Sequence, residues 1–152
     1  MGKRKAGARR VVLDTNVLVS AVGWLKGEPH RIMENVIRGE IELFISYGQF
    51  EELSRELDCP KFKFTEIRKL GFKRLPTEKA TFVDRKITLD IVKDDPSDNI
   101  ILESAFATKA DFIITGDEHL RAEGELEGVR IVTASQFLSA EAEGVSGAAQ
   151  IR

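Results

Sequence analysis

Three aspartates stand where strands of a predicted sheet end. Asp14 comes directly after an apolar Val-Val-Leu run, and Asp117 follows the strand predicted over 112–115 by two residues. Asp98 lies just after the turn that leaves a third predicted strand, at 87–92. Because the carboxyl ends of parallel strands meet at one edge of a sheet, and ligands bind beyond that edge, we expect the three carboxylates to converge there.

Asp14 lies between two apolar segments, and no Lys or Arg adjoins it in the sequence. A buried carboxylate without a partner costs free energy or takes up a proton, so a bound cation is a natural partner. A capping aspartate in a tight turn is the alternative that the sequence leaves open. Asp98 shares a helix face with the apolar residues 101, 102 and 105. A metal ligand and a helix cap are equally compatible with that position.

Carboxylate oxygens suit Mg²⁺ or Mn²⁺ better than zinc or copper. Three or four of them around one or two such ions can activate a water molecule and stabilise an in-line phosphoryl displacement. A fourth acid is available on the helix predicted over 46–57, whose core face is formed by residues 50, 53 and 57. Its candidates are Glu51, Glu52 and Glu56. The helical spacing does not choose among them and predicts that all three are solvated.

Strand and helix signals alternate along the chain. Strands are expected at 11–13, 40–45, 87–92, 112–115 and 129–132. Helices are expected over 15–22, 29–39, 46–57, 66–72, 77–85, 97–108 and from 135 onward, with Thr15, Ser46 and Thr65 as N-cap residues. This alternation favours right-handed βαβ units and a mostly parallel sheet covered on both faces, which is an α/β fold.

The composition is typical of one globular domain. The chain has 152 residues, 42% of them apolar and 32% charged, and a core of normal depth can form without disulfides or structural metals. One cysteine, Cys59, excludes an internal disulfide framework and a zinc site built from cysteines. No apolar run reaches the length of a membrane span, and the N-terminus is a poor signal peptide. We therefore expect a soluble, cytoplasmic protein with no membrane partner.

The charge is unevenly distributed. Five of the 23 basic residues lie within residues 1–10, which leaves 18 basic against 25 acidic residues in the rest of the chain. We expect a basic flexible arm at 1–10, a folded domain at 11–139 and a small-residue tail, partly disordered, at 140–152. The arm could contact the phosphates of a nucleic acid, or it could be a solvated terminus.

Several blocks of the sequence resemble the PIN-domain family. These are metal-dependent nucleases, many of them VapC-like toxins of toxin–antitoxin pairs. The blocks follow the family's order and span about residues 11–139: Val11–Ala21, Ser46–Phe62, Asp95–Ala105, Ala110–Asp117 and Val129–Val132. The resemblance implies a three-layer α/β/α sandwich.

The resemblance also implies which residues form the site. The family's helix glutamate lies six residues after the strand-end serine, here Ser46, and precedes a leucine; Glu52 fits. Two departures are a serine, Ser97, where many relatives carry Asp, and His119, where relatives often carry an acid; we interpret His119 as an exposed loop residue. The implied acidic set is Asp14, Glu52, Asp98 and Asp117, with Asn16 and Thr115 orienting ligands or water.

These observations give a leading hypothesis and alternatives. The first is a Mg²⁺- or Mn²⁺-dependent endoribonuclease whose three aspartates hold the principal ion, while Glu52 binds a second ion or positions the attacking water. Its expected partners are an RNA substrate, an antitoxin protein and a second copy of the chain. The main alternative is a non-catalytic RNA-binding or protein-interaction module on the same fold. A haloacid-dehalogenase-like phosphatase is disfavoured, because its general acid would fall at Asn16, which cannot serve.

Overall fold

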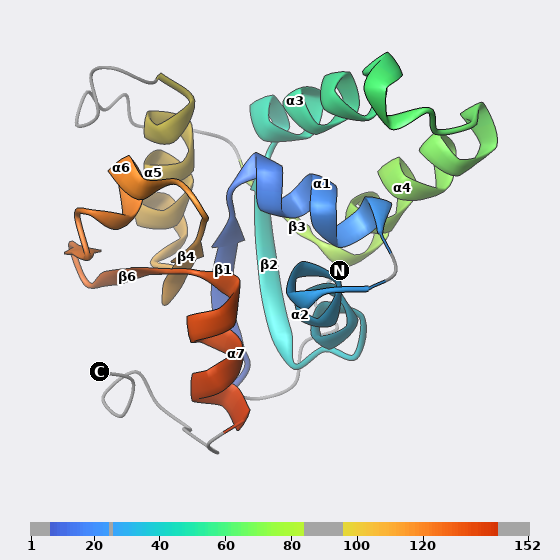
Figure 1. Cartoon of the computed structure of the whole chain (residues 1–152). Helices are drawn as coiled ribbons and strands as arrows, with labels where there is room; N and C mark the ends of the chain where they lie inside the picture. Colours follow the sequence, from blue (N-terminus) through green and yellow to red (C-terminus); the bar gives the residue numbers. More distant parts are fainter. Residues whose placement is uncertain (1–6, 25, 84–95, 143–152) are drawn as a thin grey trace.

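The computed structural model describes residues 7–24, 26–83 and 96–142, with residues 96–98 and 142 described by their backbone alone. Six strands in this part of the chain form one sheet in the order β3-β2-β1-β4-β6-β5 (Figure 1). Neighbouring strands run parallel except for β5 and β6. The strands are β1 (Arg9–Leu13), β2 (Ile41–Ser46), β3 (Thr81–Val83), β4 (Phe112–Ile114), β5 (Glu125–Leu126) and β6 (Val129–Val132).

Helices cover both faces of this sheet. Helices α1, α2 and α7 lie over one face and α5 lies over the other, which confirms the predicted α/β class and its three layers (Figure 1). The helices are α1 (Thr15–Gly23), α2 (Glu28–Ile37), α3 (Tyr47–Leu57), α4 (Glu66–Lys79), α5 (Pro96–Thr108), α6 (Glu118–Arg121) and α7 (Ala134–Ala142), with a 3-10 turn, η1 (Pro60–Phe62).

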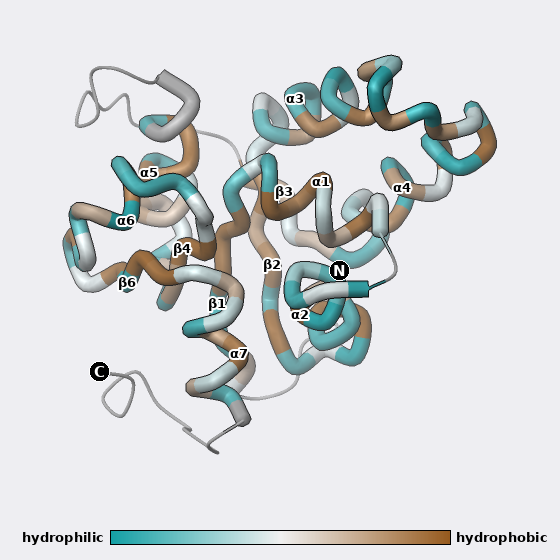
Figure 2. Tube along the Cα trace, viewed as in Figure 1, coloured by the Kyte–Doolittle hydropathy of each residue, from teal (hydrophilic) through white to brown (hydrophobic). Residues whose placement is uncertain are grey.

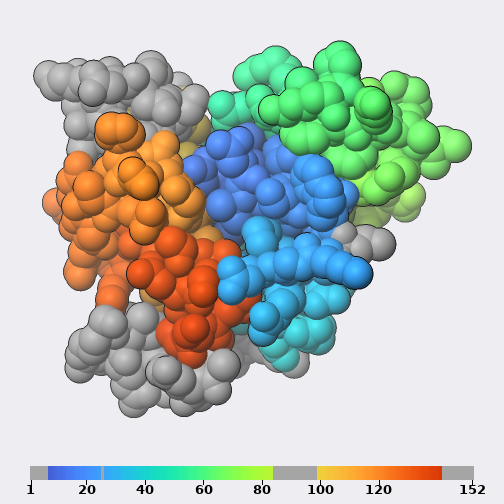
Figure 3. Space-filling view, viewed as in Figure 1, coloured from blue at the N-terminus to red at the C-terminus, as the bar shows by residue number. Residues whose placement is uncertain are grey.

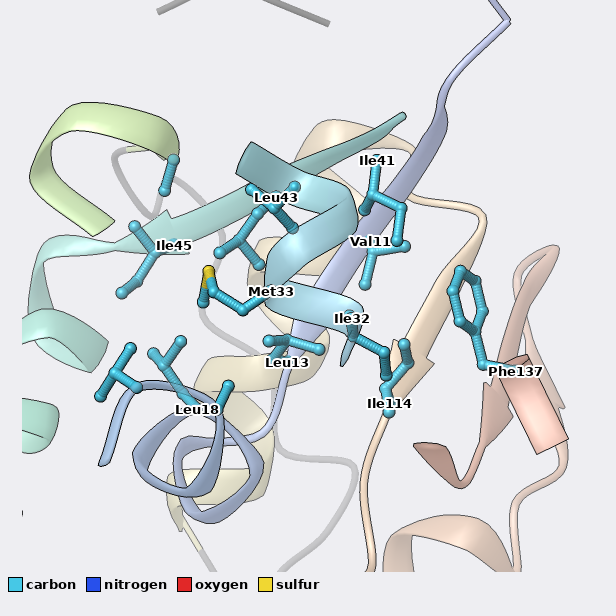
Figure 4. Packing of buried hydrophobic residues seen from close by; sticks show 14 of the residues in the cluster. Val11, Leu13, Leu18, Ile32, Met33, Ile41, Leu43, Ile45, Ile114 and Phe137 are labelled. Atoms are coloured by element: carbon cyan, nitrogen blue, oxygen red, sulfur yellow. The ribbon is translucent and has the colours of Figure 1, made fainter. Parts of the chain in front are cut away.

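The central strand β1 sends alternate side chains into two cores. Val11 and Leu13 pack with residues of α1 and α2, such as Leu18 and Ile32 (Figure 4). Val12, between them, packs on the opposite face against α5. All three β1 side chains are at most 1% exposed, and burying an aliphatic side chain of this size contributes about 1.5–3 kcal/mol. The end of β1 is therefore firmly fixed within the sheet.

Two of the three predicted N-caps are confirmed. The Ser46 hydroxyl accepts a hydrogen bond from the Gln49 backbone N–H at 3.0 Å, so α3 begins where β2 ends. The Thr65 hydroxyl likewise accepts from the Arg68 N–H and starts α4. Thr15 is not a cap: it is the first residue of α1, and Asp14 occupies the N-cap position without a capping bond from its side chain.

The predicted boundary between helices 66–72 and 77–85 is wrong. Helix α4 continues through Pro76 to Lys79, and its last turn closes with a bond from the Ala80 N–H to the Pro76 carbonyl. The chain then forms strand β3, which pairs with β2. Strand pairing, a tertiary contact, overrides the local helical signal after residue 79. The short elements β5 and α6 were not predicted, and the strand expected at 87–92 lies outside the described residues.

Strand β1 begins two residues before its predicted start. Arg9 and Arg10, expected in the basic arm, pair with β2, and the buried Arg9 guanidinium lies 3.3 Å from a Glu141 carboxylate oxygen. Glu141 belongs to α7, so the helix also continues past the predicted domain end at 139. Among the described residues, no helix combines the length and the apolar character that crossing a membrane would need.

Candidate active site

Asp14 is the residue at which the chain changes from strand to helix. Its backbone N–H donates to the Ile114 carbonyl of β4 at 3.0 Å, and its own carbonyl accepts from the Leu18 N–H at 2.9 Å. The backbone thus continues the sheet on one side and begins α1 on the other. Since the carboxylate does not cap the helix, it can face the edge of the sheet and its neighbour β4.

Thr115 joins two of the predicted acids. This residue, which directly follows β4, is fully buried. Its hydroxyl donates to Asp14 Oδ2 at 2.6 Å and accepts from the Asp117 N–H at 3.0 Å. Asp14 and Thr115 are 101 positions apart in the chain, and the parallel pairing of β1 with β4 brings them together. The predicted convergence is therefore observed for the ends of these two strands.

Among the described residues, contacts to the Asp117 carboxylate involve one of its two oxygens. Oδ1 accepts from the backbone N–H groups of His119 and Leu120, at 2.8 and 3.1 Å, and so caps α6. Oδ2 has no hydrogen-bond partner among the described residues. His119 itself is exposed, as predicted. One oxygen of Asp117 is thus available to a ligand.

The negative charge at this pair is poorly compensated. The pKa of Asp14 is raised above its ordinary value of 3.8, chiefly because burial removes the carboxylate from water. The Asp117 charge raises this pKa further, whereas the Thr115 hydroxyl and the amides of Asn16 and Thr15 act in the opposite direction. Within the described part of the chain neither aspartate has an ion-pair partner. A bound cation would stabilise the ionised form of Asp14 and lower its pKa.

Of the three glutamates of α3, Glu52 is the one held beside the end of β1. Its Oε1 accepts from the Thr15 hydroxyl at 2.6 Å, and Thr15 is the neighbour of Asp14. Glu52 and Glu56 are half-buried, so the prediction from spacing that all three glutamates are solvated is wrong for these two. Glu51 is exposed, and Glu56 is half-buried without a hydrogen bond or ion pair to a described residue. This geometry favours the glutamate that the family resemblance selected.

Gln49 is a polar residue at the same edge that the sequence analysis missed. It is 1% exposed, and its Nε2 donates to the carbonyl of Leu13, the last residue of β1. Its Oε1 is buried and has no hydrogen-bond partner in the described structure. A signal was present: Gln49 precedes Leu53 by four residues and Leu57 by eight, so it shares their buried face.

Asp98 and Asn16 are the two remaining predicted site residues. Asp98 lies in the first turn of α5, whose residues Ile101, Leu102 and Ala105 are buried as predicted, but its side chain is outside the described structure. Asn16 is exposed and makes no side-chain hydrogen bond to a described residue. Its predicted orienting role is therefore not supported by a contact.

The donor set can be compared with the needs of a metal ion. All the acids brought to this edge offer oxygen, the ligand type of Mg²⁺ and Mn²⁺. The described side chains alone include no group of three or more acidic, His or Cys residues placed to hold an ion. Asp14 and Asp117 supply two carboxylates. Asp98 lies in the first turn of α5 and is predicted to lie at the same edge, but its side chain is not among those described. The chemistry of these donors fits a hard divalent cation.

The family model of the PIN domain matches residues 10–119, so the chain belongs to the PIN-domain family. A comparison with curated proteins finds no match. PIN domains are typically nucleases and generally use divalent metal ions. Family membership therefore supports, at this coarse level, a hydrolase that acts on nucleic acid.

Proposed function

We propose that the protein is an endoribonuclease that depends on Mg²⁺ or Mn²⁺ and hydrolyses RNA phosphodiester bonds. One observation carries the proposal: the half-buried Asp14 and Asp117 share the Thr115 hydroxyl and have no cationic partner among the described residues. A carboxylate that is ionised while largely removed from water is stabilised by a nearby cation. Membership of a family of nucleases indicates that the reaction is hydrolysis of a nucleic acid.

The proposal gives each residue a role. Asp14, Asp98 and Asp117 hold the principal ion, and Glu52 either holds a second ion or orients the attacking water. A divalent ion bound there lowers the pKa of a bound water and stabilises charge on the phosphate during in-line displacement. Thr115 fixes Asp14 through its hydroxyl, and no side-chain nucleophile is needed.

The test is cleavage of a single-stranded RNA in the presence of Mn²⁺. Asp98→Asn and Asp117→Asn keep the side-chain size and remove a ligand charge, so each should lower the rate at least tenfold, or about 1.4 kcal/mol of barrier. Glu118→Gln, an exposed acid next to Asp117, is the matched control and should cleave like wild type. Undiminished cleavage in both aspartate variants would refute the assignment.

The same assay sorts the glutamates of α3. Glu52→Gln should lower the rate, while Glu51→Gln and Glu56→Gln should not, because Glu52 alone among them contacts Thr15 in the described structure. Binding of RNA without cleavage, at any metal concentration, would instead favour the non-catalytic module. An antitoxin partner and a homodimer remain part of the proposal, and co-purification with a neighbouring small protein and the mass in solution test them.

A further inference from the structure

Besides residues 1–10, a second segment of the chain is rich in basic residues. Residues 60–79, which form η1 and α4, hold seven basic and two acidic residues, whereas the whole chain has a net charge of −2. Part of this positive charge is paired, since Lys69 and Lys73 contact Asp58 and Arg74 contacts Glu78. The remainder has no carboxylate partner among the described residues: Lys61, Lys63, Arg68 and Lys79.

Aromatic rings lie under two of these cations, Lys61 and Arg68. Phe62 and Phe64 stack with their centroids 5.5 Å apart, and Trp24 contacts both rings edge-on at 5.4 and 5.7 Å. The Lys61 ammonium lies 5.1 Å from the Phe62 ring centroid, and the Arg68 guanidinium lies 5.3 Å from that of Phe64. Trp24 is 45% exposed, so an aromatic surface borders the positive charge on the outside of the protein.

The local sequence builds this cluster where α1 ends. Gly23 is the last residue of α1, and a Cβ there would lie 3.0 Å from the Phe64 ring, so glycine lets Phe64 approach the helix. Trp24 follows as the C-cap residue. Figure 3 shows α3 and α4, in green, as a lobe at one side of the molecule, and Figure 2 shows that the backbone trace of this lobe is largely hydrophilic with apolar positions at intervals.

We propose that this surface, formed by Trp24, Lys61, Lys63 and Arg68, binds single-stranded RNA and holds one strand of the substrate. Unpaired cations attract phosphates, and an exposed aromatic ring stacks on bases whatever their sequence, a combination that single-strand binding uses. The proposal rests on the proposed function, since it names the surface that presents RNA to the acidic site.

The distance to the acidic site suits one continuous strand. Helix α1 has Asp14 at its N-cap and Trp24 at its C-cap, ten residues apart, and at 1.5 Å per residue this separates them by about 15 Å. A few nucleotides bridge such a distance. The carboxylates at the N-terminal end of α1 repel RNA phosphates unless a cation is bound there. The basic surface at the other end of the helix attracts phosphates. This surface would therefore provide affinity for RNA that the acidic site alone does not provide.

Another occupant of the lobe would be a protein. Ile67 and Leu70, on α4, are 82% and 68% exposed and would suit an apolar partner. Nothing beside these two apolar side chains indicates what would cover them, whereas the cations and aromatic rings described above lie together and suit RNA. We therefore propose RNA as the ligand, and the experiment below also tests for a protein partner.

The experiment measures fluorescence anisotropy of a labelled single-stranded oligoribonucleotide, with EDTA present so that no cleavage occurs. The double variant Lys61→Gln, Lys63→Gln should bind more weakly and reduce the salt dependence of log K by about 1.4, or 0.7 for each lost phosphate contact. Trp24→Ala should weaken binding at least about fivefold. Arg74→Gln, on the same helix but paired with Glu78, is the matched control and should leave affinity unchanged.

Two outcomes overturn the inference. Unchanged affinity and salt dependence in both the lysine and the tryptophan variants would exclude RNA from this surface. A change in solution mass with Ile67→Ser, Leu70→Ser, together with unchanged RNA affinity in the lysine variant, would assign the lobe to a protein partner. If wild type binds RNA through these residues but never cleaves it with Mn²⁺, the proposed function fails while the surface assignment stands.

Discussion

Replacing Thr115 by valine removes one hydroxyl and keeps nearly the same shape at a fully buried position. That hydroxyl donates to Asp14 at 2.6 Å and accepts from the Asp117 N–H at 3.0 Å. The substitution therefore breaks the contact that joins the two acids without opening a large cavity. We expect it to destabilise the metal-free protein, and to do so in a pH-dependent manner.

The magnitude follows from these two hydrogen bonds. A bond to an ionised group contributes about 1.5–3 kcal/mol, and a donor left unsatisfied costs about 1–3 kcal/mol when it is buried. Asp117 is only partly buried, so leaving its backbone N–H without an acceptor should cost about 1 kcal/mol, the low end of that range. We expect a total loss of about 3 kcal/mol at pH 7, which lowers Tm by about 6–12 °C in a protein of this size.

The pH dependence has a definite sign. The Thr115 hydroxyl lowers the pKa of Asp14, so valine raises that pKa further above the unfolded value of 3.8. The ionised form of Asp14 is then more costly in the folded state, and the loss of stability grows as pH rises through the folded-state pKa. At a pH below 3.8, where Asp14 is protonated in both states, the loss should shrink.

Urea denaturation at several pH values between 3 and 8 (a range chosen to bracket the carboxylate pKa) measures this effect. Thr108→Val is the matched control, because its buried hydroxyl donates to the Ser104 carbonyl at 2.8 Å and makes no hydrogen bond to a carboxylate of the described residues. It should cost about 1 kcal/mol at every pH. If Thr115→Val shows the same flat profile as the control, the hydroxyl does not govern the charge of Asp14.

Three further outcomes are expected. Without metal, Asp14→Asn should be more stable than wild type at pH 7 in urea denaturation, and the difference should vanish below the unfolded pKa of 3.8, because the folded-state pKa is raised. Mn²⁺ at one hundred times its Kd should stabilise wild type by about 2.7 kcal/mol in a thermal melt and stabilise Asp14→Asn much less; an equal rise would place the ion elsewhere. Ser46→Ala should cost about 1 kcal/mol by urea denaturation, because α3 loses its cap, with no loss expected for the exposed Ser135→Ala.

The sheet and the meeting of Asp14 with the segment after β4 could be predicted from the sequence. Both depend on one rule, that apolar strands separated by helices form a parallel sheet with a common carboxyl edge. The rule fixes which strand ends converge and needs no side-chain detail. It therefore placed Asp14 and Asp117 in one region although they are 103 positions apart in the chain, as the Thr115 contacts confirm.

The position of Glu52 could not be derived in this way. A helical wheel describes α3 about its own axis, but the choice among its glutamates depends on how α3 packs against α1. That packing brings the Thr15 hydroxyl within 2.6 Å of Glu52, and no local signal encodes it. The helix predicted after residue 77 failed for a related reason, since β3 gains its bonds from β2, a partner distant in sequence.

Two acids at the carboxyl edge of the sheet accept hydrogen bonds from hydroxyl groups, whereas several described carboxylates elsewhere form ion pairs. Thr115 holds Asp14, and Thr15 holds Glu52, each through a hydroxyl. Elsewhere carboxylates meet cations, as Asp58 does with Lys69 and Glu141 with Arg9. A hydroxyl fixes the direction of a carboxylate without cancelling its charge, whereas a Lys or Arg would do both. At Asp14 the fold thus orients the carboxylate and, among the described residues, leaves its charge without a cationic partner, which suits the proposed divalent-metal site.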